Sequence, residues 1–129
     1  MAYSRTMMGG SGISSGMALA INGGAATHVP AGTTNADATA LGRLGIAFIA
    51  STPSGTGVRL QSGAPGDSIV VANQDAANAL LVYPPVTIGG VAAAINNLTA
   101  TTGGFSIAAN RRATFYCVSA SQWVSVLSA

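Results

Sequence analysis

From Met17 onward, the apolar residues of this 129-residue chain stand in short runs, and each run is closed by Gly, Pro, Asn, Asp, Ser or Thr. Such short runs are typical of β-strands, because an amphipathic helix repeats its apolar residues every three or four positions over a longer stretch. The runs that we predict as strands are residues 17–22, 45–51, 57–61, 68–73, 79–83, 91–95, 105–108, 113–118 and 122–127. Many short strands separated by turns predict an all-β fold, a small sandwich or jelly-roll-like barrel of about eight short strands.

The order of residues within the runs predicts which side chains share a face of a sheet. Val58 and Leu60 alternate with two polar residues, so they lie on one face while the polar residues lie on the other. By the same rule Ile46, Phe48 and Ala50 share one face of their strand. This alternation is expected of sheets with one face in the core and one face outside it.

The segments between the runs have the composition of turns. Residues 73–78 join two apolar runs through Asn and Asp, whose side chains bond their own backbone, and we predict a hairpin there. Residues 62–67 form a second loop, and the prolines at 84–85 end a strand because proline donates no ladder hydrogen bond. Residues 119–121 connect the last two strands.

Charged residues make up only 6% of the chain, and it contains no Lys and no Glu. An average soluble domain carries roughly 25% charged residues. With a mean hydropathy of +0.48, the chain must enter a membrane or cover apolar surface in another way. Its apolar runs are far shorter than the roughly 18 residues of a membrane-spanning helix. Contacts between subunits are what remains, so we expect a homo-oligomer.

Residues 1–16 are rich in Gly and Ser and lack a sustained periodicity, which is typical of a flexible arm. We therefore expect a flexible N-terminal arm over residues 1–16 and a single β domain over residues 17–129. Large side chains on an arm can fill pockets on a neighbour, although a frayed terminus without a role remains the alternative. The arm residues that we expect to contact a partner are Tyr3, Arg5, Met7 and Met8.

Few residues could carry out chemistry. His28 is the only histidine, and Asp37, Asp67 and Asp75 each stand in a turn-like context, where bonding to the backbone is their usual role. Cys117 lies within an apolar run and is expected to be a small buried side chain. Catalysis needs a paired nucleophile and base, paired carboxylates or a metal cluster. We therefore expect no catalytic residues, no metal site and no cofactor, and hence no enzyme.

Two features could indicate a ligand. Tyr83, Tyr116 and Trp123 are expected either in the core or in an exposed aromatic patch that could stack on a sugar, and the core is favoured because Trp123 alternates within an apolar run. Arg111 and Arg112 form the only basic cluster, which is too little for a nucleic-acid surface. We expect neither a membrane nor a nucleic acid as a partner.

The C-terminal half, over residues 57–127, resembles a module in structural proteins of tailed bacteriophages. The segments that carry the resemblance, in order, are residues 57–60, 66–73, 79–85, 113–117 and 121–123. In such phages, small β-rich proteins of this size resemble decoration, or cement, proteins, which sit as trimers on the outside of the capsid. Similar modules occur in head fibres and tail fibres. The first 56 residues match nothing in this pattern, so the mode of attachment is left open.

The resemblance implies a structural virion protein that decorates and stabilises the capsid as a homo-oligomer, with a trimer expected. Its partners would be further copies of itself and the major capsid protein. The alternative is a head-fibre, tail-fibre or spike module that binds a receptor or glycan. A single cysteine and the absence of a secretion pattern in residues 1–16 indicate synthesis in the host cytoplasm before assembly into the virion.

Overall fold

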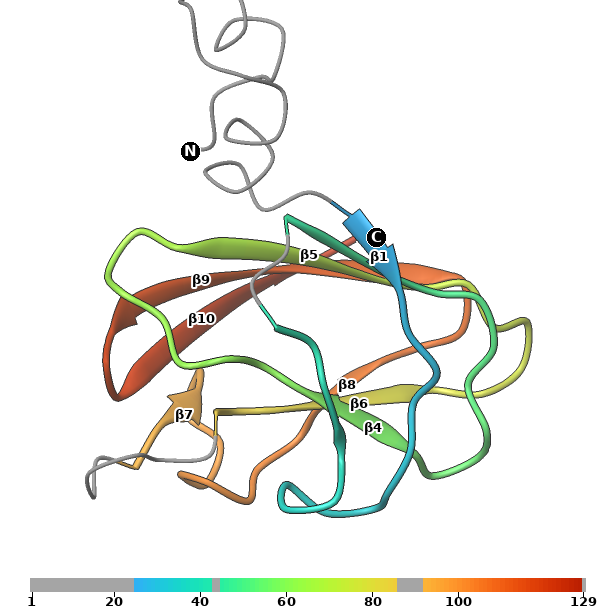
Figure 1. Ribbon diagram of the computed structural model, residues 1–129, viewed down its shortest axis with the longest axis horizontal. Helices are drawn as coiled ribbons and strands as arrows, with labels where there is room; N and C mark the ends of the chain where they lie inside the picture. Colours follow the sequence, from blue (N-terminus) through green and yellow to red (C-terminus); the bar gives the residue numbers. More distant parts are fainter. Residues whose placement is uncertain (1–24, 43–44, 86–91, 129) are drawn as a thin grey trace, which may run out of the picture.

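The computed structural model describes residues 25–42, 45–85 and 92–128, and the strand predicted at residues 17–22 lies outside them. Ten strands fall within the described residues (Figure 1). They are β1 (Ala25–Thr27), β2 (Thr39–Ala40), β3 (Ile46–Ile49), β4 (Gly57–Arg59), β5 (Ser68–Asn73), β6 (Leu80–Tyr83), β7 (Ala94–Ile95), β8 (Phe105–Ile107), β9 (Arg111–Ser119) and β10 (Gln122–Leu127).

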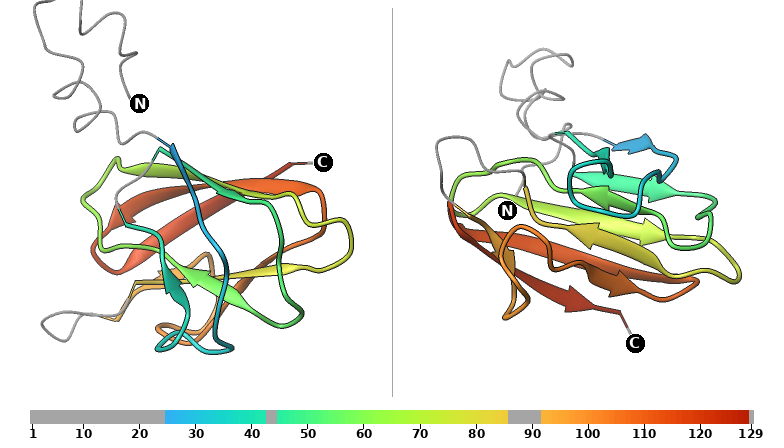
Figure 2. Two further views of the ribbon diagram at one scale, coloured as in Figure 1. Left: turned by 45° about the vertical axis from the view of Figure 1, so that its right-hand side comes forward. Right: turned by 90° about the horizontal axis from the view of Figure 1, so that it is seen from below.

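The strands form two sheets that face each other as a small sandwich (Figures 1 and 2). The six-stranded sheet has the order β1-β3-β5-β9-β10-β7, and the four-stranded sheet has the order β2-β4-β6-β8. The predicted all-β class is therefore confirmed. Within the described part of the chain there is no helix with the length and apolar character needed to cross a membrane.

The first six strands alternate between the two sheets, so the backbone winds around the core. β1, β3 and β5 are parallel neighbours in one sheet, and β2, β4 and β6 are parallel neighbours in the other. Ile46 is level with Val70 and Gly57 with Leu81, so the second and third windings are offset by the same number of residues in both sheets. β8, β9 and β10 then join antiparallel to β6, β5 and β9. This winding makes the molecule a sandwich and not a jelly roll, whose strands are antiparallel.

The predicted hairpin at residues 73–78 is wrong. The segment connects β5 in the six-stranded sheet to β6 in the four-stranded sheet, so the flanking strands do not pair. Turn residues mark where the chain changes direction but do not tell which sheet the next strand joins. The connection at residues 119–121 is confirmed, because β9 and β10 are antiparallel partners with Ser119 opposite Gln122. β1 and β2 were missed because two or three small residues have no detectable period.

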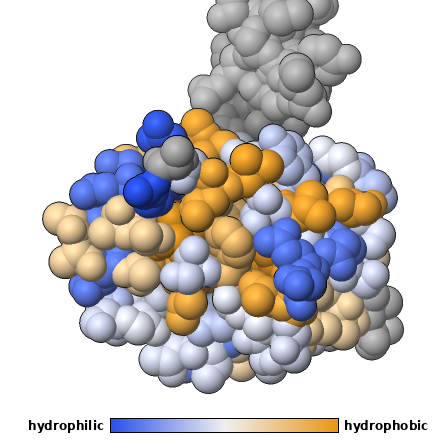
Figure 3. All heavy atoms as spheres, turned by 180° about the vertical axis from the view of Figure 1, so that it is seen from behind, coloured by the Kyte–Doolittle hydropathy of each residue, from blue (hydrophilic) through white to orange (hydrophobic). Residues whose placement is uncertain are grey.

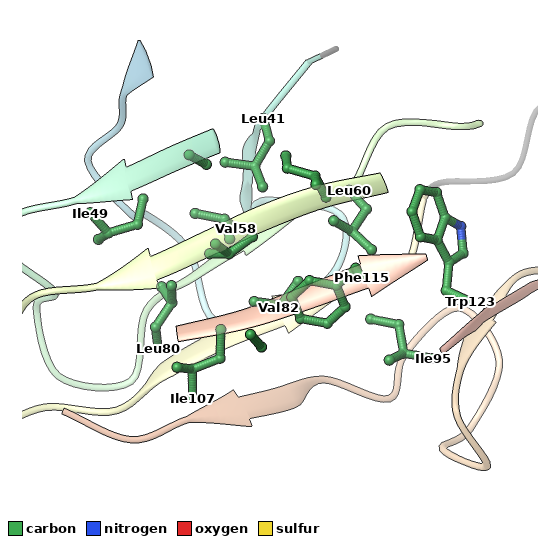
Figure 4. Packing of buried hydrophobic residues seen from close by; sticks show 14 of the residues in the cluster. Leu41, Ile49, Val58, Leu60, Leu80, Val82, Ile95, Ile107, Phe115 and Trp123 are labelled. Atoms are coloured by element: carbon green, nitrogen blue, oxygen red, sulfur yellow. The ribbon is translucent and has the colours of Figure 1, made fainter. Parts of the chain in front are cut away.

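The core lies between the two sheets (Figure 4). Phe115 of β9 is fully buried, and its ring meets that of Phe105 edge to face with the centroids 5.6 Å apart. Val58 and Leu60 are buried as their alternation predicted. Each large apolar side chain buried in this way contributes about 1.5–3 kcal/mol. The core residues are Leu41, Ala47, Ile49, Val58, Leu60, Ile69, Val71, Leu80, Val82, Ile95, Ile107, Ala113, Phe115, Cys117 and Trp123.

Candidate interaction surface

The aromatic residues Tyr83, Tyr116 and Trp123 lie in three different places. Trp123 is 4% exposed and belongs to the core (Figure 4). Tyr116 is exposed, because neighbouring residues of β9 point alternately into and away from the core. Tyr83 is buried, but on the side of β6 opposite the core residue Val82. The three side chains therefore form no common surface for stacking on a sugar.

Tyr83 lies beneath residues 31–38, which we call the cover segment. Its hydroxyl donates a hydrogen bond of 2.8 Å to the carbonyl oxygen of Thr33. Its ring lies against two glycines: a Cβ on Gly57 would stand 2.7 Å from Cε2, and a Cβ on Gly104 would stand 3.0 Å from Cε1. Glycine at both positions leaves room for the ring, because a Cβ at either would crowd it.

Polar side chains fix the cover segment to the rest of the molecule. Nη1 of Arg59 donates to the carbonyl oxygens of Asn35 and Ala36, at 3.1 and 3.3 Å. Nδ2 of Asn35 donates to the carbonyl oxygen of Pro84 at 2.6 Å, and Asn35 is buried. Part of the outer side of the four-stranded sheet is thus covered by the chain itself.

The candidate reactive side chains mostly bond backbone groups, and Cys117 and Asp67 lie near each other. The backbone N–H of His28 donates to the carbonyl oxygen of Phe48, while its buried Nε2 has no hydrogen-bond partner among the described residues. Burial raises the pKa of the Cys117 thiol, and the nearby Asp67 carboxylate adds to the rise, so the thiol stays protonated and unreactive. No group of three or more His, Cys, Asp or Glu side chains suited to a metal ion occurs in the part of the chain that is described.

All three aspartates close turns, and Asp67 does so by accepting a hydrogen bond of 2.9 Å from the N–H of Ala64. The Thr34 hydroxyl, and after it the Thr34 N–H, bond Asp37 and lower the pKa of its carboxyl group. Asp75 accepts hydrogen bonds from three backbone N–H groups, which lower its pKa likewise. All three carboxylates therefore have a structural explanation in the turns they close.

The outer face of the six-stranded sheet, by contrast, is apolar and lies open among the described residues. Six large apolar side chains on it are between 38% and 61% exposed. They come from three strands that lie within four consecutive positions of the sheet, β3-β5-β9-β10. Figure 3, which shows the molecule from behind the view of Figure 1, also shows apolar residues grouped between hydrophilic ones. The six residues are Ile46, Phe48, Tyr116, Val118, Val124 and Val126.

A row of β-branched side chains crosses the middle of this face. Ile46 is level with Val70, Val70 with Thr114, and Thr114 with Val126, so the row spans four adjacent strands. Neighbouring strands lie about 4.8 Å apart, and a row of this kind therefore forms a continuous ridge. Arg112 carries the only charge among the described side chains on this face of β3, β5, β9 and β10.

β3 has the reverse of the usual distribution of side chains. Ile46, Phe48 and Ala50 do share one face, as predicted, but it is the exposed one, whereas Ala47 and Ile49 are buried. Two of the three large side chains of this strand, Ile46 and Phe48, thus lie outside the core, and Ile49 lies in it. Alternation alone could not reveal this, because it separates two faces without telling which one is covered.

The arm residues Tyr3, Arg5, Met7 and Met8 lie outside the described residues. A scan against protein-family models found no family that matches the chain. A search of curated proteins found no similar sequence.

Proposed function

We propose that this protein is a structural subunit of a larger assembly, with the outer face of the six-stranded sheet as a protein contact. The observation that carries the proposal is that face, with six exposed apolar side chains. The largest exposed apolar patch on a monomeric protein is typically about 300–600 Å² and is often an interaction site. The low charge of the whole chain, 6%, supports the same conclusion.

We further propose that the assembly is the capsid of a tailed bacteriophage and that the protein decorates it. The support is the resemblance of residues 57–127 to phage structural modules. In this proposal the protein is made in the host cytoplasm, forms a homo-oligomer, with a trimer expected, and stabilises the virion surface by bridging copies of the major capsid protein. Repeated copies that act together would strengthen such binding without new contacts. The protein is proposed to have no enzymatic activity and no cofactor.

The alternative role, a fibre or spike module that binds a receptor or glycan, has less support. A sugar-binding platform needs exposed aromatic rings placed together. Tyr83 and Trp123 are buried, and Tyr116 is exposed without either of them beside it.

The experiment that tests the proposal is electron microscopy of intact particles of the phage whose genome encodes the chain. We expect density for the protein at regular positions on the outer capsid, and we expect it to be lost from particles made without the gene. A position on a tail or head fibre would replace capsid decoration by the alternative. Absence of the chain from purified particles, measured by mass spectrometry, would contradict both.

The proposed role of the arm can be tested separately. Deletion of residues 1–16, with Tyr3, Arg5, Met7 and Met8, should lower occupancy on the capsid while the β domain stays folded and oligomeric. Circular dichroism and sedimentation report on the domain, and occupancy is read from particle density. Unchanged occupancy would remove the arm from the proposal.

A further inference from the structure

We infer that the outer face of the six-stranded sheet packs against the same face of a second copy of this chain. The inference rests on the proposed function in one respect, namely that the protein is a subunit of an assembly. It adds the identity of the partner that covers this face. Because the same face lies on both sides of the contact, a twofold axis relates the two copies, and the contact pairs them as a dimer and not as the trimer expected above.

The size of the face fits a stable contact between subunits. The six exposed apolar side chains present on the order of 500 Å². The half-buried neighbours Val70 and Thr114 lie between them and extend the surface. A stable interface buries about 800 Å² per partner, so this face supplies much of what is needed.

The shape of the face is also suited to a copy of itself. Two sheets pack face to face about 10 Å apart when side chains from both interdigitate. The ridge formed by Ile46, Val70, Thr114 and Val126 consists of stiff β-branched side chains, which lose little rotamer freedom when they are covered. An identical ridge on a second copy, placed beside it, would fill the grooves along its sides.

The charge distribution favours a second copy over a charged partner. Arg112 stands at the beginning of β9, at the end of the sheet, and is exposed there. Arg112 is in line with Ala72 and Phe48, one side-chain position from Thr114 at the end of the face. Two copies can cover the ridge while the long Arg112 side chain reaches past the end of the contact to water, so that no buried charge is left unpaired. Interfaces between identical subunits are also more apolar than other protein interfaces, as this face is.

The test is the mass of the purified full-length chain, measured by sedimentation over a range of concentrations. We expect the native protein to form a dimer, or a higher even multiple, of its 12.6 kDa chain. Val126→Arg places a charge on the ridge, where covering it would strip its water, and should weaken association at least tenfold. The matched control is Val29→Arg, because Val29 is 71% exposed and follows β1 outside the sheet.

A second variant guards against a folding defect. Should Val126→Arg unfold, Tyr116→Arg makes the same change on the neighbouring strand, and circular dichroism checks both. A native protein that stays monomeric overturns the inference, as does association that neither variant weakens. Equal weakening by Val29→Arg would also overturn it.

The same experiments separate this inference from the proposed function. Monomeric protein that still decorates particles would remove the second copy as the partner of this face, so the inference fails while decoration stands. An oligomer that Val126→Arg disrupts, from a chain absent from the particles, would uphold the inference and remove the capsid role.

Discussion

The side chain of Asn73 joins four parts of the chain at one buried point. Its Nδ2 donates to the carbonyl oxygens of Asn78 and Ile107, at 2.9 and 3.0 Å. Its Oδ1 accepts hydrogen bonds from the Thr52 hydroxyl at 2.8 Å and from the N–H of Asp75 at 3.2 Å. The amide therefore satisfies backbone groups where β5, β8 and two connections meet. Because all of these hydrogen bonds are made, the polar side chain can be buried in a core that is otherwise apolar.

Removing this amide should be among the costliest single changes in the molecule. Asn73→Ala leaves several buried donors and acceptors without partners, and we expect a loss of about 3 kcal/mol or more in the free energy of unfolding. Urea denaturation followed by circular dichroism measures the loss. Asn97→Ala, at an exposed asparagine, is the control and should change stability by less than about 0.5 kcal/mol. A similar effect of the two substitutions would contradict the central role given to Asn73.

The contact between Tyr83 and Gly104 makes a second prediction at the scale of single residues. A Cβ on Gly104 would be 3.0 Å from the Tyr83 ring, whereas a Cβ on Gly57 would also be 2.7 Å from the backbone oxygen of Leu81. Gly104→Ala should therefore cost about 1–3 kcal/mol in the native protein and much less in a Tyr83→Ala background. Gly57→Ala should stay costly in both backgrounds, because backbone cannot move aside. A double-mutant cycle measured by thermal unfolding tests this, and equal coupling at both glycines would refute it.

The lowered pKa of Asp75 predicts how stability depends on pH. The N–H groups of Asn78, Thr52 and Ala77, in that order, stabilise the ionised carboxylate and hold its pKa below the ordinary value of 3.8. Because the folded state has the lower pKa, this contribution is fully present above the unfolded value and is lost as the pH falls through the folded pKa. Asp75→Asn should thus flatten the acid limb of a stability profile measured by urea denaturation at a series of pH values. An unchanged acid limb in Asp75→Asn would show that these hydrogen bonds do not control it.

At the scale of elements, the cover segment depends on side chains from strands far along the sequence. Arg59→Met keeps the apolar stem of the side chain and removes the hydrogen bonds to Asn35 and Ala36. We expect faster hydrogen exchange at the N–H of Ala38, which bonds Thr34 within the segment. The loss of global stability should be about 1–3 kcal/mol at most, because the segment can open locally.

The matched control for this element is Arg111→Met. Arg111 is exposed, and its guanidinium makes one long contact, 3.4 Å, with the carbonyl oxygen of Ser128. Exchange in the cover segment should not respond to this change. Protection at Ala38 that is equal in the two variants would mean that Arg59 does not hold the segment.

The sequence predicted strands far better than it predicted their partners. The bounds of β5 and β10 agree with the prediction, because each is an apolar run closed by turn residues on both sides. The connection at 73–78 was misread because Asn73 has the residue type of a turn, although it is buried and bonds across both sheets. Parallel pairing joins residues that are far apart in the chain, and local periodicity contains no information about it.

At the scale of the whole molecule, composition predicted that apolar surface must be covered, but not where it lies. The low charge is a property of the entire chain, whereas the candidate surface is set by which face of each strand meets the opposite sheet. Ile46 and Phe48 have the hydropathy of core residues, yet they are exposed, and Ala47 and Ile49 occupy the core. Only the pairing of β3 with β5, and of β5 with β9, brings Ile46 into line with Val126.

The scarcity of charge on the outer face leads to a last prediction, about salt. Screening shortens from about 10 Å at ~0.1 M to about 3 Å at ~1 M ionic strength, so an interface held by ion pairs weakens across this range. The face formed by β3, β5, β9 and β10 has Arg112 as the one charge among its described side chains. Association of two copies through this face should therefore stay constant or strengthen as salt is added. Strongly excluded salts such as sulfate strengthen the burial of apolar surface. Sedimentation of the native chain at the two ionic strengths, in chloride and in sulfate, measures this. Dissociation at high chloride would show that charged residues outside this face hold the subunits together, and the apolar ridge would then lose its role.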